Sequence, residues 1–506
     1  MPIVRFWVAV ISVCCVALGP PLAQAAANST ITIAVPEEPA PFDTCAVGTI
    51  AASRILLNNV ADAITAYIPE TNAVVPSLAT SWKQTSPATW EFNLRSGVRF
   101  SDGTPFNAAA AATSIKRTFN HALNCSVASQ IFAGEQVVPE AIGNTRLRLT
   151  TSRPDPILPL RATFLAISAP STESDRNTEH PIGTGAYKVD NWAHGTSITL
   201  VPNPFFNGPK PKITQVTYVF RPEARVRVDM VNTGEADMAL SLPPEFASQK
   251  GALQFDPPEV ILLRMDALTA PFNDKRVRQG VLSAIDRPGL IKALYGGNAS
   301  VATQAITRNV PGFNPHIVPP RYDPALAKKL IAEAKASGVP VDKPMKIYNR
   351  AGLVLNGQQL AEALAEELDA VGLNVSVDTM DVAPWVEILF SHPADRSGLL
   401  LEDHANNLGD PSLTVDARFD PRRTRSQVPK EDQSTVANLI RLAENGRGEQ
   451  RTALFQKLFA FMATDATQDA YIAAARSTML VGPRVSYKPN WRSNQLIPLA
   501  NVHLRQ

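Results

Sequence analysis

Apolar and polar residues alternate along several short stretches in the first half of the chain, as they do in strands with one buried face. We expect strands at 30–35, 187–192, 197–203 and 213–220. The last of these is rich in β-branched and aromatic residues, which favour strands. The stretch 90–100 alternates on both sides of Gly97, so it predicts a hairpin that turns at this glycine.

Amphipathic helices with clear caps dominate from about residue 263 onward. Asp323 stands directly before Pro324, and Asp286 stands two residues before Pro288, which is typical of helix starts because Asp caps the first turn and proline fits it. Other helices are expected near 107–119, 224–233, 274–285 and 360–371, with a long helical stretch at about 431–464. Asn273 or Asp274 begins the third of these. The helix at 360–371 lies between alternating stretches at 345–350 and 374–380, an order that predicts a βαβ unit.

The size and charge of the chain narrow the class of protein. With 506 residues the chain is too long for one ordinary core, so we expect two or more lobes. Its 48 basic and 46 acidic side chains give a net charge of +2, which argues against a nucleic-acid binder. The 42 prolines are scattered, which indicates ordered turns rather than a disordered linker.

The N-terminus has the pattern of a signal peptide at 1–25. Arg5 precedes a short apolar run, two prolines end that run, and Ala23-Gln24-Ala25 provides a cleavage site. The run is shorter than the roughly 20 apolar residues of a membrane-spanning helix. We therefore expect cleavage and export to the periplasm, with a retained N-terminal anchor as the alternative.

Two of the four cysteines, Cys45 and Cys125, remain after such cleavage. An even pair of cysteines in an exported chain indicates a disulfide. The alternative is two separate buried thiols.

The sequence lacks the motifs of common secreted enzymes and metal sites. It has no H-E-x-x-H, C-x-x-C or G-x-S-x-G pattern, and the run GTGAYK at 183–188 lacks the residues of a phosphate-binding loop. We therefore expect no enzymatic activity, no cofactor and no metal. His392 and His404 could still meet in space and bind nickel, whereas a secreted hydrolase is disfavoured by the missing motifs.

Several blocks of the sequence are similar to the family 5 extracytoplasmic solute-binding proteins, the peptide- and nickel-binding group of ABC importers. They are VVPSLATSWKQTSPATWEFNLRSGVRFSDGTPFNA, PIGTGAYKV, NPFFNGPKPKITQVTYVF, PFNDKRVRQGVLSAIDRPGLIKALYGG and RYDPALAKKLIAEA. These blocks occur in the family's order and are spread over residues 74–334, more than half of the chain that follows the signal peptide.

The resemblance implies an α/β fold, namely the two-lobed periplasmic-binding-protein fold (type II, large three-subdomain variant) with the ligand cleft between the lobes. Lobe I would comprise 26–265, with 475–506 returning to it, and lobe II would comprise 266–474. The lobes would close on a peptide or similar small polar ligand. The protein, expected to be a monomer, would deliver this ligand to the membrane permease of an ABC importer. A role in chemoreception stays open, as do opine-like, sugar-conjugate and metal-chelate ligands.

The resemblance also places ligand contacts in the segment LLLEDHANNLGDPSL. In peptide binders of this family, an Asp three residues before an acidic-Pro pair holds the ligand's α-ammonium group. Asp410-Pro411 matches that pair, so the ammonium position falls on Asn407. Asn offers a carbonyl and an amide instead of a charge, which suits hydroxyls or carbonyls at least as well. A slip of the alignment would bring in the neighbouring carboxylates of Glu402 or Asp403.

The full set of expected ligand contacts is Phe42, Asp43, Thr44, Trp385, Asp403, His404, Asn406, Asn407 and Asp410. The first three follow the first strand, where family members bring groups to the ligand; a plain loop is the alternative there. For 403–407 the alternative is a solvated polar loop, and for Trp385 it is a role in the core of lobe II.

Overall fold

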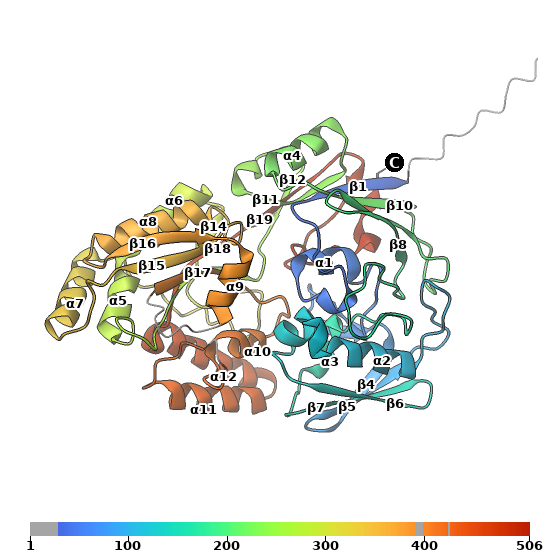
Figure 1. The fold of residues 1–506 in the computed structure, drawn as a ribbon, viewed down its shortest axis with the longest axis horizontal. Coiled ribbons are helices and arrows are strands. Elements are labelled where there is room, and N and C mark those ends of the chain that lie inside the picture. Colours follow the sequence, from blue (N-terminus) through green and yellow to red (C-terminus); the bar gives the residue numbers. More distant parts are fainter. Residues whose placement is uncertain (1–28, 391–397, 424–425, 506) are drawn as a thin grey trace, which may run out of the picture.

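Strand β1 (Thr30–Val35) lies inside a seven-stranded sheet because both of its faces are apolar. Ile31, Ile33 and Val35 pack in the large core of this part of the molecule. Ala34 packs on the opposite face, against helix α4 (Ala224–Thr233). The computed structural model describes residues 29–390, 398–423 and 426–505 and shows two lobes, each built on a mixed sheet (Figure 1).

The large sheet of lobe I has the strand order β12–β19–β11–β1–β10–β9–β8. Its other strands are β8 (Tyr187–Ala193), β9 (Ser197–Pro202), β10 (Gln215–Phe220), β11 (Met238–Leu242), β12 (Ala252–Phe255) and β19 (Ser477–Val481). β1 runs parallel to β10 and β11, whereas β8, β9, β12 and β19 pair antiparallel. The strands expected in this half of the chain are thus confirmed.

A four-stranded sheet forms a further layer of lobe I, seen at the lower right of Figure 1. Its order is β4 (Ala79–Ser86), β5 (Thr89–Leu94), β7 (Arg146–Thr151) and β6 (Val137–Ile142). Helix α2 (Ala108–Thr118) packs against it and is capped by Asn107, as expected. Lobe I also contains α1 (Ile50–Leu56), β2 (Thr65–Ile68), β3 (Ala73–Pro76), α3 (Leu158–Arg161), β20 (Val485–Ser486) and β21 (His503–Leu504).

The hairpin expected across Gly97 is wrong. Strand β5 pairs with β4 and β7 instead of with the residues after the glycine. Val98 and Phe100 are buried, but between them Arg99 makes only an isolated bridge with Pro105. Alternating burial in a loop therefore imitated the pattern of a strand.

The six-stranded sheet of lobe II is buried on both faces. Its order is β14 (Ala299–Val301), β18 (Asp469–Ala475), β13 (Glu259–Met265), β17 (Gly398–Ala405), β15 (Met345–Arg350) and β16 (Val375–Met380). In β13, Ile261 and Leu263 face one core and Val260 and Leu262 face the other. A continuous apolar run is what such a strand requires.

Helices cover both faces of this sheet (Figure 1). One core contains residues of α5 (Lys275–Ala284), α6 (Arg287–Tyr295), α7 (Pro324–Ala336) and α8 (Gly357–Asp369). The other contains residues of α11 (Gln433–Asn445) and α12 (Gly448–Phe461), so the long helical stretch is two helices separated at Gly446. Lobe II also includes α9 (Val382–Phe390) and α10 (Pro411–Thr414).

The local predictions in lobe II are confirmed. Asp274, Asp286 and Asp323 each cap a helix by accepting a hydrogen bond from a backbone N–H of the first turn. The βαβ unit is present, because β15 and β16 run parallel with α8 between them in the chain.

The chain crosses between the lobes twice, at neighbouring positions. The first crossing joins β12 to β13 and the second joins β18 to β19. Phe255 pairs with Ser477 on the lobe I side, and Arg476 Nε lies 3.2 Å from Asp256 Oδ1 in the crossing segments themselves. Because β13 belongs to the sheet of lobe II, the first crossing precedes Glu259, one strand earlier than the boundary expected at 265/266.

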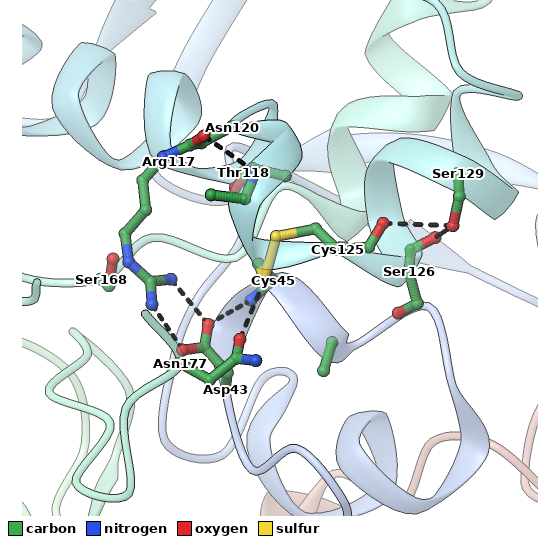
Figure 2. Close-up of a disulfide and its surroundings, with 12 residues drawn as sticks. Asp43, Cys45, Arg117, Thr118, Asn120, Cys125, Ser126, Ser129, Ser168 and Asn177 are labelled. Atoms are coloured by element: carbon green, nitrogen blue, oxygen red, sulfur yellow. Dashed lines mark hydrogen bonds and ion pairs between the residues drawn. A yellow bond between two sulfur atoms is a disulfide. The ribbon is translucent and has the colours of Figure 1, made fainter. Parts of the chain in front are cut away.

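Cys45 and Cys125 form a disulfide inside lobe I, as expected (Figure 2). Cys45 lies in the short helix η1 (Thr44–Ala46), and Asp43 caps that helix by accepting from the Cys45 N–H. The Asp43 carboxylate also accepts two hydrogen bonds, at 2.7 and 2.6 Å, from the buried guanidinium of Arg117 at the end of α2. The Thr178 N–H donates to the same carboxylate at 2.8 Å. The disulfide and the Asp43–Arg117 ion pair thus both join the loop after β1 to α2 and the residues that follow it.

Replacing both cysteines, Cys45→Ser with Cys125→Ser, should lower the free energy of unfolding by about 4 kcal/mol. The bond closes a loop with a sequence separation of 80 residues, and its loss frees that loop in the unfolded chain. Urea unfolding followed by circular dichroism measures the change. The wild-type protein in a reductant is the matched control and should unfold like the double variant. Equal stability of the oxidised wild type and the variant would contradict the prediction.

Candidate functional site

One segment of lobe II, the docking segment 406–419 that follows β17, packs against lobe I. Leu408 and Leu413 of this segment are buried in the core of lobe I instead of in either core of lobe II. Gly409, at φ +76°, lies so close to lobe I that a Cβ there would be 2.8 Å from the Trp491 ring. In Figure 1 helix α10, part of this segment, lies beside α3 of lobe I. The region expected to bind ligand is therefore at the junction of the lobes.

Asn406 fixes the shape of the turn that begins this segment. Its buried side chain donates to the Asp410 carbonyl at 2.9 Å and to the Thr414 hydroxyl at 2.8 Å. It also accepts from the Gly409 N–H at 3.1 Å. The His404 ring lies 2.8 Å from the same Thr414 hydroxyl. These bonds give both Asn406 and His404 a part in holding the turn.

Asp410 caps helix α10 and forms an ion pair with Arg451. Its carboxylate accepts from the Ser412 N–H at 2.9 Å and from two guanidinium nitrogens of Arg451, both at 2.8 Å. Arg451 lies over the Phe455 ring, 4.7 Å from its centre. Burial raises the pKa of Asp410, but Arg451 and Ser412 lower it more, and the net direction is downward. The protein itself therefore supplies hydrogen-bond donors to both oxygens of this carboxylate.

Asn407 differs from its neighbours in having hydrogen-bonding capacity to spare. Its side chain is half-buried and makes no hydrogen bond with any residue that the structure describes. It belongs to the turn that lies against lobe I. Of the residues in this turn, Asn407 is thus the one whose amide is available to a ligand.

A second group of polar side chains lies beside the two crossings between the lobes, which we call the hinge. This hinge cluster consists of Arg54, Ser241, Glu259, Asp403 and Asn494. Asn494 of lobe I donates to Glu259 of lobe II at 2.7 Å. The Arg54 guanidinium donates to the Ser241 hydroxyl at 3.0 Å and to the Asn494 carbonyl at 2.7 Å. Glu259 and Asp403 come from the paired strands β13 and β17, at the end of the sheet next to the first crossing. The cluster therefore joins both lobes beside the hinge.

The positive charge near the two carboxyl groups of the hinge cluster does not compensate for their burial. Burial raises the pKa of Glu259, and Asn494 and Arg54 offset only part of that rise. Burial, and then the charge of Glu259, raise the pKa of Asp403 well above its ordinary value. The Asp403 Oδ1 atom is buried and has no hydrogen-bond partner in the described part of the chain. Buried carboxylates normally have such partners, so Asp403 is suited to a cationic group from outside the protein.

The other predicted contacts lie elsewhere. Phe42 is buried in the core of lobe I, Asp43 is bound by α2 as described above, and Thr44 is buried in η1. Within residues 29–390, 398–423 and 426–505, no hydrogen bond or ion pair joins these three to 403–410. Trp385 is buried in α9 of lobe II. The structure thus brings together Asp403, His404, Asn406, Asn407 and Asp410, but not the loop after β1.

Four members of the hinge cluster were not among the residues expected from the sequence, namely Arg54, Ser241, Glu259 and Asn494. Glu259 has a recognisable signal, because it is a charged residue at the head of the apolar run of β13. Arg54 and Asn494 lie 440 residues apart, and only the return of the C-terminal tail to lobe I brings them together. No local pattern marks such residues.

Two further features concern membranes and metals. Across the described residues, no helix combines the length and apolar character needed to cross a membrane. The same residues contain no group of three or more His, Cys, Asp or Glu side chains able to hold a metal ion. The expected signal peptide and His392 lie outside the described residues.

Comparisons with known proteins identify relatives along most of the chain. Residues 73–411 match the family described as bacterial extracellular solute-binding proteins, family 5 Middle. The glutathione-binding protein GsiB of Escherichia coli is 28% identical over 310 residues, which cover 58% of this chain and 58% of GsiB. A probable di/tripeptide-binding protein 5 of Pseudomonas aeruginosa is 24% identical over 86% of this chain and 88% of that protein.

A solved structure shows the same fold. The dipeptide-binding protein of Pseudoalteromonas in complex with Met-Leu has a TM-score of 0.81 and 19% identity, covering 94% of this chain and all of that one. The expected α/β, two-lobed fold is thereby confirmed. With the family match spanning 73–411, the turn 406–410 included, the chain belongs to family 5 of the bacterial extracellular solute-binding proteins.

Proposed function

We propose that this protein is the substrate-binding component of an ABC importer and captures a small peptide or peptide-like ligand between its lobes. The observation that carries the proposal is the turn 406–410 at the start of the docking segment, called the docking turn. It lies against lobe I and carries Asn407, whose polar side chain has unused hydrogen-bonding capacity. Family membership supports this role, since the family consists of solute-binding proteins. Binding and lobe closure require no bond making or breaking, so we propose no enzymatic activity.

The names of the relatives support a peptide-like ligand. They bind glutathione and, by name, di- and tripeptides, all small molecules with amide groups and charged ends. We assign the ligand's cationic group to Asp403 and Glu259 of the hinge cluster, because Asn407 carries no charge. Asn407 then binds a carbonyl or hydroxyl of the same ligand. In this arrangement Asn406, His404 and Asp410 shape the turn instead of contacting the ligand.

The same proposal includes the location of the protein and the membrane partner that receives the ligand. We infer a periplasmic protein whose residues 1–25 serve as a cleaved signal peptide, acting as a monomer on a membrane permease. A chemoreceptor would bind ligand in the same way, and transport differs from it only by the need for that permease. Uptake of labelled ligand by cells with and without the permease separates the two roles.

Dipeptides with a free amino terminus should stabilise the protein, and their N-acetylated counterparts should not. Ligand that copurifies is first removed by unfolding and refolding. A ligand at 100 times its Kd adds about 2.7 kcal/mol to the free energy of unfolding, which thermal melts detect. Acetylation removes the positive charge that Asp403 and Glu259 are proposed to bind. Equal melting shifts from both peptide sets would contradict the cationic assignment, and shifts from sugar conjugates or nickel complexes alone would replace the ligand class.

The variant Asp403→Asn should stabilise the ligand-free protein at pH 8 while weakening its binding of a cationic ligand. Because the folded-state pKa of Asp403 is raised, the folded protein binds a proton that the unfolded chain has released. The free energy of unfolding therefore falls as the pH rises from the ordinary carboxyl range through the raised pKa. Asn removes that loss, so the variant should gain about 1–3 kcal/mol at pH 8 and little at pH 4.

Binding and stability are measured separately in this test. Isothermal titration calorimetry with the best stabilising dipeptide should show at least a tenfold weaker affinity for Asp403→Asn, roughly the loss of one charge-assisted hydrogen bond. Asp378→Asn is the matched control, because Asp378 lies on β16 of the same sheet and pairs with Lys346. The control should keep the wild-type ligand affinity. Unchanged binding by Asp403→Asn would rule out its assigned role.

A further inference from the structure

A buried ion network joins the lobes at the end of the docking segment, away from the hinge cluster in sequence. Asp416 of η6 (Val415–Phe419) in lobe II accepts from Arg153 at 2.9 Å and from Arg161 at 3.0 Å, and both arginines belong to lobe I. The Asp416 side chain is only 2% exposed, and that of Arg161 is 7% exposed. One carboxylate is thus held between two guanidinium groups of the opposite lobe.

Further residues extend this network without leaving a net charge. Within lobe I, Asp155 lies 3.2 Å from Arg161, and Glu135 lies 3.2 Å from Arg153. Arg423 of lobe II reaches back to Glu135 at 3.2 Å. We call the three carboxylates and three arginines, Asp416, Asp155, Glu135, Arg153, Arg161 and Arg423, the latch network.

The partners of Asp416 within its own lobe are poor replacements. Arg423 lies 3.8 Å from its carboxylate, beyond ordinary hydrogen-bond length. Arg418, two residues away on η6, is already bound by Glu402 at 2.6 Å and by Asp469 at 2.7 Å. If the lobes separated, Asp416 would lose both of its short bonds and keep only the longer contact with Arg423. Breaking a buried pair is strongly unfavourable.

The latch is mechanically connected to the turn that carries Asn407. Asp410 caps α10, Leu413 is buried in the core of lobe I, and Asp416 follows without a break in the helical backbone. Movement of the turn away from lobe I must therefore pull Leu413 and Asp416 with it. A ligand that holds Asn407 and the ion pairs that hold Asp416 act on the two ends of one short rigid segment.

We propose that Asp416 is a closure latch and positioning residue: its ion pairs with Arg153 and Arg161 hold the docking segment against lobe I and set the balance between closed and open lobes. This role is independent of which ligand is bound. It therefore goes beyond the proposed function, and a protein that bound no peptide would still show it.

The test measures inter-lobe distance in the ligand-free full chain. A donor and an acceptor dye on introduced cysteines, at exposed Lys116 in lobe I and exposed Lys329 in lobe II, report the distance by single-molecule energy transfer. Asp416→Asn should shift the balance toward open lobes by roughly tenfold or more, because two bonds to a charged carboxylate are weakened. An unchanged distance distribution in a folded Asp416→Asn protein would overturn the proposal.

Two further variants keep the test decisive. Asp274→Asn is the matched control, since this carboxylate of lobe II pairs with Arg276 of the same lobe, outside the latch network, and it should leave the distance unchanged. Arg153→Gln approaches the latch from lobe I at a side chain that is 26% exposed, and it should open the lobes even if Asp416→Asn fails to fold. In the double variant the two effects should not add, because each removes the same bond. Full additivity, or an effect of Asp274→Asn equal to that of Asp416→Asn, would refute a specific latch.

Discussion

The pairing of β12 with β19 and of β13 with β18 is the constraint on which the rest of the molecule depends. It places the two crossings side by side, so the lobes are joined along one line and can rotate about it without breaking either sheet. The sheets themselves are packed on both faces and resist deformation. Motion is therefore confined to a few residues between strands, the usual arrangement of a hinge.

Rigidity within lobe II determines where the docking segment points. Arg418 joins η6 to two strands of the sheet, because it binds Glu402 on β17 and Asp469 on β18. Burial opposes the charge of Arg418, but these two carboxylates outweigh it and raise its pKa. With Arg418 fixed on one side of η6, Asp416 is turned toward lobe I. A buried ion cluster in the core of one lobe thus positions the ion that reaches the other.

Local features were the most predictable from sequence. The caps Asp274, Asp286 and Asp323 act through backbone groups within their own first turns, so neighbouring residues contain the whole signal. The hairpin at Gly97 failed because a strand's partner is chosen by the whole sheet, here by β4 and β7. The division of the lobes was displaced for a related reason: the apolar run of β13 fits either lobe, and only its pairing with β17 and β18 assigns it.

The candidate site shows the same separation between local and distant information. The family's motif points to the turn around Asn407, since the motif and the turn are one continuous segment. It gives no warning of Glu259 or Asn494, which reach the site from the hinge and from the C-terminal tail. The resemblance also suggested the loop after β1, yet the Asp43 carboxylate there is already bound by Arg117 and by two backbone N–H groups. A carboxylate's sequence position does not reveal whether the protein has already neutralised it.

The contrast between two carboxylates explains how such a molecule could respond to a ligand. Asp416 is bound by two arginines of the opposite lobe, so contact between the lobes has its own source of stability. Asp403, next to the hinge, has one oxygen that is buried without a hydrogen-bond partner among the residues that the structure describes. Under the proposed assignment of Asp403 to the ligand's cationic group, closure of an empty protein gains at the latch but leaves Asp403 without that partner. A cationic group bound at Asp403 would remove the unfavourable part while leaving the latch unchanged. A ligand can shift a conformational balance only by such a difference in its interaction with the two states, and under the proposed function Asp403 provides that difference.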